Sequence, residues 1–130
     1  MTVSRYFSSA VATDESRETF ASNIKDAYEK FHLDGIDIDW EYPGQQGSGG
    51  NLVDPYDSRN FLSFLQVLRD VLPPDARITA AAQTVPFTDA SGDPLKDVSD
   101  FVHVLDWILI MNYDVWGCKD IPFLLVILTR

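Results

Sequence analysis

Residues 33–43 constrain the fold of this chain more than any other segment, because acidic and apolar side chains alternate there one by one. Asp37, Asp39 and Glu41 are each separated by an apolar residue. In an extended strand successive side chains point to opposite faces, so the three carboxyls would share one face and the apolar side chains the other. The segment therefore predicts a β-strand from about Gly35 to Glu41, with one face to bury and one acidic face.

The acidic face would hold three carboxyls close together. Neighbours on one face of a strand are roughly 6.5–7 Å apart, from a rise of about 3.3 Å per residue. Like-charged carboxyls at this spacing cannot all ionise freely, so one of them is expected to hold its proton, as acid-assisted bond cleavage requires. An acidic edge strand without chemistry and a calcium site are the alternatives, although Tyr42 stands where an EF-hand loop would need glycine.

The rest of the chain alternates helical and strand patterns. Helices are predicted at Asp14–Phe31, Ser58–Leu72 and Leu95–His103, and apolar strands at Arg77–Thr84 and Trp107–Tyr113. The glycine-rich segment between the acidic strand and the second helix is predicted to be an exposed, flexible loop. The first helix has an apolar stripe made of Phe20, Ile24, Ala27, Tyr28 and Phe31. The stripe of the second helix is expected to be buried and comprises Phe61, Phe64, Leu65, Leu68 and Leu72.

This order of helix and strand implies parallel strands joined by helical crossovers, hence an α/β fold. The two apolar strands are expected to be covered on both faces. Both a doubly wound sheet and a (β/α)8 barrel fit the pattern. In either fold functional groups gather at the carboxyl ends of the strands, where Glu41, Tyr113 and Asp114 would lie.

The overall charge excludes some partners. The 130 residues carry a formal net charge of −10, whereas nucleic acids and anionic membranes need clustered Lys or Arg. The longest apolar run, Phe123–Leu128, is far shorter than the roughly 20 residues that span a bilayer, and no secretory signal is visible. Cys118 is the single cysteine, and His32 and His103 have no ligand spacing, so no metal or other cofactor is expected. A neutral polysaccharide is a compatible partner.

The acids also carry a family resemblance. Asp34, Asp37, Asp39 and Glu41, at these offsets inside an apolar strand and followed by Tyr42-Pro43, resemble the fourth-strand motif of glycoside hydrolase family 18, the retaining chitinases. The motif is specific, because four acids stand at fixed positions within one strand.

Further segments resemble the same family. Ser4–Ser8 is similar to the segment after the family's third barrel strand, and Met111–Asp114 is similar to its sixth-strand motif. Trp116-Gly117 continues the pattern of fungal members. The resemblance covers about residues 3–117 and implies part of a (β/α)8 TIM barrel, from strand four to strand six.

The resemblance implies a role for each matching residue. Glu41 would be the general acid and base, and Asp39 would hold the N-acetyl group of the substrate, whose own oxygen would attack the anomeric carbon. Asp37 would pair with Asp39 and share a proton. Tyr113 would hydrogen-bond the acetamido oxygen, and Asp114 would contact the sugar near the scissile bond.

Other residues have weaker assignments. Tyr42, Gln83 and Trp116 are candidates for a sugar cleft, with ordinary packing as the alternative. Trp40 is expected to be a packing residue, because it lies on the apolar face of the acidic strand. Asp34 has the opposite parity to Asp37, so a structural role at the strand entrance is expected.

The resemblance implies a chitinase catalytic domain in part, over residues 1–117, with chitin or chito-oligosaccharide as the partner. Residues 118–130 do not resemble the family and are interpreted as a divergent tail, either a genuine strand or an artefact of the gene model. A typical barrel needs about 250 residues, so we expect an internal piece of a longer protein, weakly active or inactive by itself. The parent family is extracellular, and the compartment of this chain is left open.

Three other functions fit the sequence. A non-catalytic oligosaccharide-binding relative would usually have lost the acid at Glu41, which is present here. An endo-β-N-acetylglucosaminidase that acts on glycoproteins shares the same acid motif. A metal-binding acidic domain is the third alternative.

Overall fold

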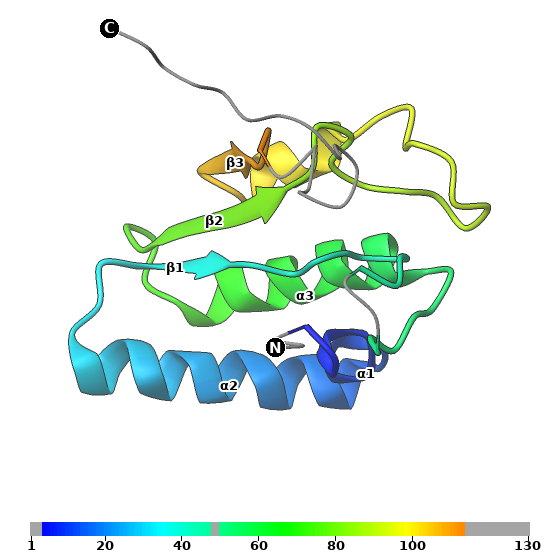
Figure 1. Cartoon of the computed structure of the whole chain (residues 1–130). Coiled ribbons are helices and arrows are strands. Elements are labelled where there is room, and N and C mark those ends of the chain that lie inside the picture. Colours follow the sequence, from blue (N-terminus) through cyan, green and yellow to red (C-terminus); the bar gives the residue numbers. More distant parts are fainter. Residues whose placement is uncertain (1–3, 48–49, 114–130) are drawn as a thin grey trace, which may run out of the picture.

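The computed structural model describes residues 4–47 and 50–113 (Figure 1), so the predicted tail 118–130 and the candidates Asp114 and Trp116 lie outside the described residues. Helices and strands alternate along the described chain. In order they are α1 (Phe7–Val11), α2 (Asp14–Phe31), β1 (Gly35–Ile38), α3 (Asp57–Val71), β2 (Arg77–Ala82), the 3-10 helix η1 (Ser99–His103) and β3 (Trp107–Ile110).

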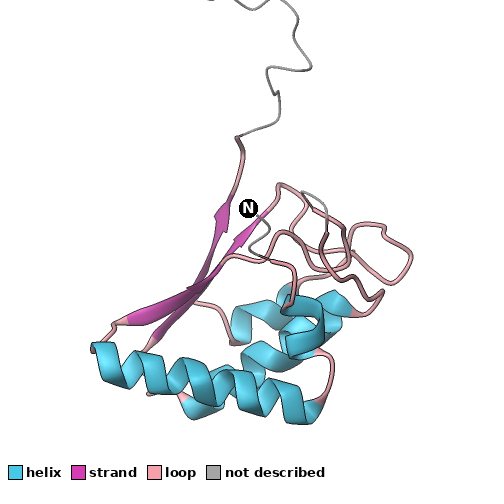
Figure 2. Ribbon diagram, turned by 60° about the horizontal axis from the view of Figure 1, so that its bottom comes forward, coloured by secondary structure: helices cyan, strands magenta, loops and turns pink. Residues whose placement is uncertain are grey.

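The three strands form one parallel sheet in the order β1-β2-β3. Figure 2 shows the helices gathered on one side of the strands. A doubly wound sheet carries helices on both faces, whereas the wall of a (β/α)8 barrel carries them on the outer face alone. Sequential order and one-sided helices in the described part of the chain therefore match a segment of a barrel. None of the described helices is long and apolar enough to cross a membrane.

The helix α2 has strong signals at both ends. Thr13 precedes it in an extended conformation, and its side chain accepts a hydrogen bond from the backbone N–H of Ser16 in a capping box. His32 caps the carboxyl end of the helix and has a left-handed backbone with φ of 51°. The predicted helix is thus confirmed, and Phe20, Ile24 and Tyr28 of its apolar stripe pack against the core. Phe31, the last residue of the helix, is 63% exposed.

The helix α3 buries the whole stripe that its spacing predicted. Phe61, Phe64, Leu65 and Leu68 are at most 1% exposed, and Leu72 caps the helix before the two prolines. Each such side chain stabilises the fold by roughly 1.5–3 kcal/mol when it leaves water. The helix begins one residue earlier than predicted, at Asp57.

Trp40 connects the acidic strand segment to this core. Its ring is 2% exposed, stacks on Phe7 at 5.2 Å between centroids, and meets the edge of Phe61 at 5.5 Å. The prediction of packing rather than sugar contact at Trp40 is therefore confirmed. The short helix α1, which contributes Phe7, carries no clear periodic signal in the sequence and was not predicted.

All three strands are shorter than predicted. Parallel pairing between β1 and β2 stops at Ile38 and Ala80, and pairing between β2 and β3 stops at Ala82 and Ile110. Apolar alternation continues past these points, but strand assignment requires a hydrogen-bonded neighbour. Similarly, the predicted helix at Leu95–His103 is reduced to the single 3-10 segment η1.

The expectation that the apolar strands are covered on both faces is wrong for β3. Trp107, Leu109 and Ile110 are between 46% and 51% exposed. Trp107 and Leu109 lie on the open face of the sheet, which the described helices leave without cover, whereas Ile110 shares the parity of Ile108 and is exposed at the end of the strand. This open face is the one on which the acidic side chains lie.

A cluster of polar side chains links the elements at the amino-terminal ends of β2 and β3. Asp106 accepts hydrogen bonds from the backbone N–H of Ile78 at 2.9 Å, from Arg77 at 2.7 Å and from Arg69 at 2.9 Å. These donors, the Ile78 N–H first, hold the pKa of the Asp106 carboxyl well below its usual range. The cluster joins β2, α3 and the start of β3.

Candidate active site

The strand register assigns side chains to the two faces of the sheet. Ile38 pairs with Ala80, which in turn pairs with Ile108, and all three belong to or pack against the core under the helices. Residues of the other parity face the open side, where Asp37 pairs with Thr79. Thr79 Oγ1 donates a hydrogen bond to Asp37 Oδ1 at 2.5 Å. The first acid of the row is therefore fixed to the neighbouring strand.

The alternation of the acidic row continues beyond the end of β1. Asp37 and Asp39 are exposed, Ile38 and Trp40 are buried, and Glu41 is half-buried. Asp39 makes no hydrogen bond within the described residues, so its carboxylate is accessible from the open face. This pattern of burial supports a shared face for Asp37 and Asp39, opposite Ile38 and Trp40, and the place of Glu41 on that face stays a prediction.

Glu41 is held through its backbone by two residues that sequence analysis missed. Its N–H donates to Ser4 Oγ at 3.0 Å, and its carbonyl oxygen accepts from Asn51 Nδ2 at 2.6 Å. The peptide bond from Glu41 to Tyr42 is cis. No spacing rule links Ser4 or Asn51 to Glu41, because each lies in another segment and meets it only in the folded chain.

The loop after the acidic row crosses toward β2. Gln83, one residue beyond β2, donates from Nε2 to Gln45 Oε1 at 3.3 Å, and Thr88 Oγ1 donates to the carbonyl of Pro43 at 3.3 Å. The Asp57 carboxylate accepts from the N–H groups of Gly44 and Asp54 at 3.2 and 2.9 Å. Most described residues of this loop are exposed, as predicted, and polar side chains hold both of its ends.

The remaining candidates lie around the same edge or away from it. Gln83 and Tyr42 are half-buried at the carboxyl ends of β2 and β1. Tyr113 follows β3 by three residues and is 63% exposed. Asp34 lies at the start of β1, where its carbonyl accepts from the N–H of Arg77 at 3.1 Å, which supports the predicted structural role.

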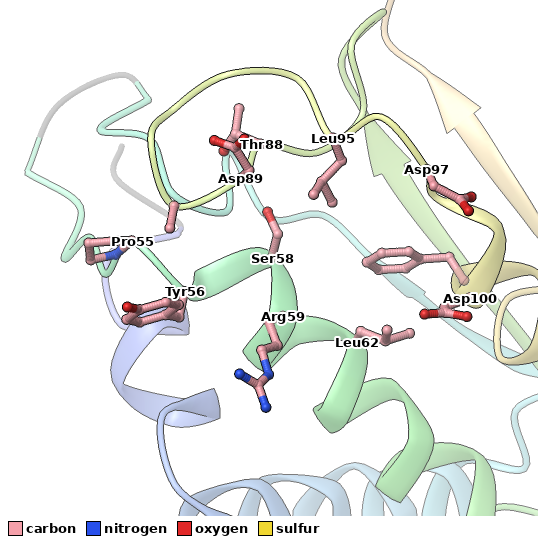
Figure 3. Close-up of a pocket in the computed structure, with 12 residues that line it drawn as sticks. Pro55, Tyr56, Ser58, Arg59, Leu62, Thr88, Asp89, Leu95, Asp97 and Asp100 are labelled. Atoms are coloured by element: carbon pink, nitrogen blue, oxygen red, sulfur yellow. The ribbon is translucent and has the colours of Figure 1, made fainter.

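The best-defined pocket lies elsewhere. It has a volume of about 270 Å³ and opens between the start of α3 and the segment that leads to η1 (Figure 3). Its lining includes Tyr56, Arg59, Leu62, Leu95 and Phe101. None of the acids of the row lines this pocket. The described residues also contain no group of three His, Cys, Asp or Glu side chains that could hold a metal ion.

A family model decides what this arrangement belongs to. The model for glycosyl hydrolases family 18 matches residues 1–122. The chain belongs to glycosyl hydrolases family 18. The match includes the acidic row, β2, β3 and the segment with Tyr113, so the predicted family and its partial TIM-barrel fold are confirmed.

Named relatives of the family extend this comparison. A chitinase-like effector of Moniliophthora roreri is 49% identical over 116 residues, which are 89% of this chain and 28% of the relative. The solved chitinase of Rhizomucor miehei superposes with a TM-score of 0.85 at 34% identity, over 91% of this chain and 32% of that one. The chain thus spans less than a third of the length of these family 18 proteins.

A second similar structure contains a ligand. It is catalytic domain 2 of the Group II chitinase of Ostrinia furnacalis, crystallised as a mutant with penta-N-acetylchitooctaose. Its TM-score is 0.72 at 26% identity, over 88% of this chain and 29% of that chain. A chitinase with this fold therefore binds an oligosaccharide of the chitin type.

Proposed function

We propose that these residues carry the acid–base half of a chitin-hydrolysing site, with retention of configuration and Glu41 as the general acid and base. The observation that carries the proposal is the acidic row on the open face, whose last member lies at the carboxyl end of β1. Family 18 membership supports a glycosidase, and the chitinase relatives support β-1,4-linked N-acetylglucosamine as the substrate unit.

In the first proposed step, Glu41 protonates the glycosidic oxygen as its bond to the anomeric carbon breaks. The acetamido oxygen of the same sugar forms a new bond to that carbon, so the intermediate is an oxazolinium ion and no enzyme carboxylate becomes glycosylated. In the second step water adds to the anomeric carbon, and Glu41 takes a proton from that water. The oxazolinium ring opens as the bond between the anomeric carbon and the acetamido oxygen breaks, and the product keeps its original configuration.

Asp39 and Asp37 support the attacking group in this mechanism. Asp39 is exposed on the same face as Glu41, roughly 6.5–7 Å along the row, and hydrogen-bonds the acetamido N–H. Asp37 lies two residues before Asp39 in the row and is oriented by the hydrogen bond that it accepts from Thr79.

Tyr113 and four other residues contact the substrate in this proposal. Tyr113, which follows β3, donates to the acetamido oxygen and aligns it. Beyond the described residues, Asp114 and Trp116 contact the sugar, as do Tyr42 and Gln83 at the rim.

One alternative has a specific observation behind it. The similar relative from Moniliophthora roreri is named a chitinase-like effector, and this chain spans 28% of it. A chain of this kind could bind chito-oligosaccharides without turnover. The presence of Glu41 favours catalysis over that alternative, because a binding role does not need a proton donor. The glycoprotein endoglycosidase is distinguished by substrate alone, and extracellular action stays a prediction.

The experiment that separates these functions is incubation of the chain with a chitin hexamer and, separately, with an N-glycosylated protein. Mass spectrometry of the products and the initial anomer in proton NMR are the readouts. We expect slow cleavage of the hexamer to β-anomers. Binding of the hexamer without cleavage would favour the binding alternative, and cleavage of the glycoprotein alone would favour the endoglycosidase.

A further inference from the structure

We propose that Ser4 and Asn51 are positioning residues that together fix the direction of the Glu41 carboxyl. The proposal rests on the proposed function in one respect, since the value of a fixed carboxyl depends on its acting as acid and base. The clamp itself, which is defined here as Ser4, Asn51 and the Glu41 peptide groups between them, is a property of the fold.

The clamp replaces hydrogen bonds that the sheet does not supply. Strand pairing of β1 ends at Ile38, three residues before Glu41, so neither backbone group of Glu41 belongs to a strand ladder. A half-buried N–H or C=O needs another partner, because a backbone group left unpaired away from water is costly. The Glu41 N–H donates to Ser4 Oγ at 3.0 Å, and the Glu41 carbonyl oxygen accepts from Asn51 Nδ2 at 2.6 Å.

Both clamp residues are rigidly placed. Ser4 is 3% exposed and Asn51 is 9% exposed, so both side chains have lost most of their freedom. The two segments are also joined to each other, because the N–H of Leu52 donates to the carbonyl of Arg5 at 3.1 Å. Three segments far apart in the sequence therefore meet at the Glu41 peptide groups.

A glycine in the loop fits this junction closely. Gly47 has φ of +55°, and a Cβ atom at this position would lie 2.2 Å from the Glu41 carbonyl oxygen and 2.9 Å from Asn51 Nδ2. No side chain can occupy that space, and an L-residue would also be strained at this φ. The loop thus passes directly over the bond between Asn51 and Glu41.

Fixing both backbone groups of one residue fixes the direction of its Cα–Cβ bond. A proton donor must lie within about 2.6–3.2 Å of the oxygen that it protonates, and a displacement of about 1 Å can cost roughly 100-fold in rate. Asn51 is suited to the task because the Glu41 carbonyl needs a donor. Its Oδ1 has no hydrogen-bond partner among the described residues, so the bond from Nδ2 sets the orientation of the amide.

The test uses three variants of the full 130-residue chain. Ser4→Ala removes the acceptor, and Asn51→Asp replaces the donor by an acceptor of the same shape. Ser58→Ala is the matched control, because its hydroxyl is 4% exposed and has no partner within the described residues. We expect Ser4→Ala to speed hydrogen exchange of the Glu41 amide by at least about 10-fold, measured by NMR, and Asn51→Asp to shift the NMR resonance of the Glu41 carbonyl carbon, which loses its donor.

Turnover of a chito-oligosaccharide is the second readout. Both clamp variants should lower kcat by about 10- to 100-fold with little change in KM, whereas Ser58→Ala should not. In Asn51→Asp the loss should diminish at low pH, where the introduced carboxyl regains a proton and can donate again. A role confined to folding would lower thermal stability without such a rescue.

Each outcome decides one question. A Glu41 amide exchange rate and a Glu41 carbonyl resonance that match the control in both clamp variants would overturn the proposal. If Ser4→Ala fails to fold, Asn51→Asp and its recovery at low pH still decide it. If the wild-type chain shows no turnover at all, the proposed function fails, whereas the NMR measurements on Glu41 still test the clamp.

Discussion

Thr79 donates a hydrogen bond to the carboxylate of Asp37 from the strand next to it, with 2.5 Å between Oγ1 and Oδ1. The two residues are register partners of β1 and β2. The Thr79 hydroxyl thus orients the carboxylate of Asp37, the first acid of the row. Strand pairing therefore determines both the face on which Asp37 lies and the orientation of its carboxylate.

The first prediction concerns this hydrogen bond. Thr79→Val keeps the shape of the side chain and removes the hydroxyl, so Asp37 loses its oriented partner. We expect kcat/KM to fall by about 10-fold and its pH profile to shift, since a hydrogen bond to a charged group is worth about 1.5–3 kcal/mol. Thr88→Val, which removes a buried hydroxyl bonded to the carbonyl of Pro43, is the control. Equal pH profiles in the two variants would count against a role of Thr79 in the site.

The second prediction concerns Asp106 and pH. The Ile78 N–H and two arginines hold the pKa of its carboxyl below that of the unfolded chain, about 3.9. Its contribution to stability is therefore fully present above the unfolded pKa and is lost as the pH falls below about 4 toward the lower folded pKa. Asp106→Asn should lower the free energy of unfolding at pH 7 by about 1–2 kcal/mol, because the charged hydrogen bonds of the carboxylate are lost. The loss is no larger because Arg77 is largely exposed and its charge is screened by solvent.

Urea unfolding at several pH values measures this effect. The difference between wild type and Asp106→Asn should shrink as the pH falls from 5 to 2. Asp75→Asn is the control, since Asp75 is exposed in the turn before β2. A difference that stays constant over this range would show that the Asp106 charge does not stabilise the sheet.

The third prediction separates two phenylalanines of the predicted stripes. Phe64 is 0% exposed and stacks on Phe20 at 4.7 Å, whereas Phe31 is 63% exposed. Phe64→Ala should destabilise the chain by about 3–5 kcal/mol or prevent folding, and Phe31→Ala should change stability by less than about 0.5 kcal/mol. Thermal and urea unfolding of both variants provide the comparison. Similar losses for both would mean that Phe31 is buried in solution.

The fourth prediction concerns the open side of β3. Trp107 and Leu109 on the open face, and Ile110 on the other face, each expose about half of their surface. The outer edge of this strand has no partner among the described strands. Such an edge associates with other chains. We expect concentration-dependent oligomers in light scattering coupled to size exclusion. Leu109→Lys should shift the distribution toward monomer, and a monomeric wild-type chain at high concentration would contradict this.

Alternation and helical spacing predicted much of the architecture. The acidic row, the burial of Trp40 and the stripe of α3 follow from local periodicity, because each depends on residues within one element. The bounds of the strands do not follow from local periodicity, since β1 ends where its pairing with β2 ends. Helical spacing alone does not reveal that Phe31, in the last turn of α2, is exposed.

The supports of Glu41 were beyond sequence reasoning. Ser4 lies 37 residues before Glu41 and Asn51 lies 10 residues after it, and neither belongs to a periodic pattern. Contacts of this kind depend on how the loop folds back, which is set by Gly47 and by the buried Asp57 carboxylate. The roles of Asp114 and Trp116, outside the described residues, stay predictions from the resemblance.

The most direct test of the account is turnover of a fluorogenic chito-oligosaccharide by the purified chain, by Glu41→Gln and by Asp34→Asn. Asp34 is an exposed acid at the opposite end of the same strand and serves as the matched control. The account predicts slow turnover by the wild type and by Asp34→Asn, and a loss of at least about 100-fold in Glu41→Gln, the contribution of general acid catalysis. Equal turnover by Glu41→Gln and the wild type would contradict the assignment of Glu41 as the acid and base.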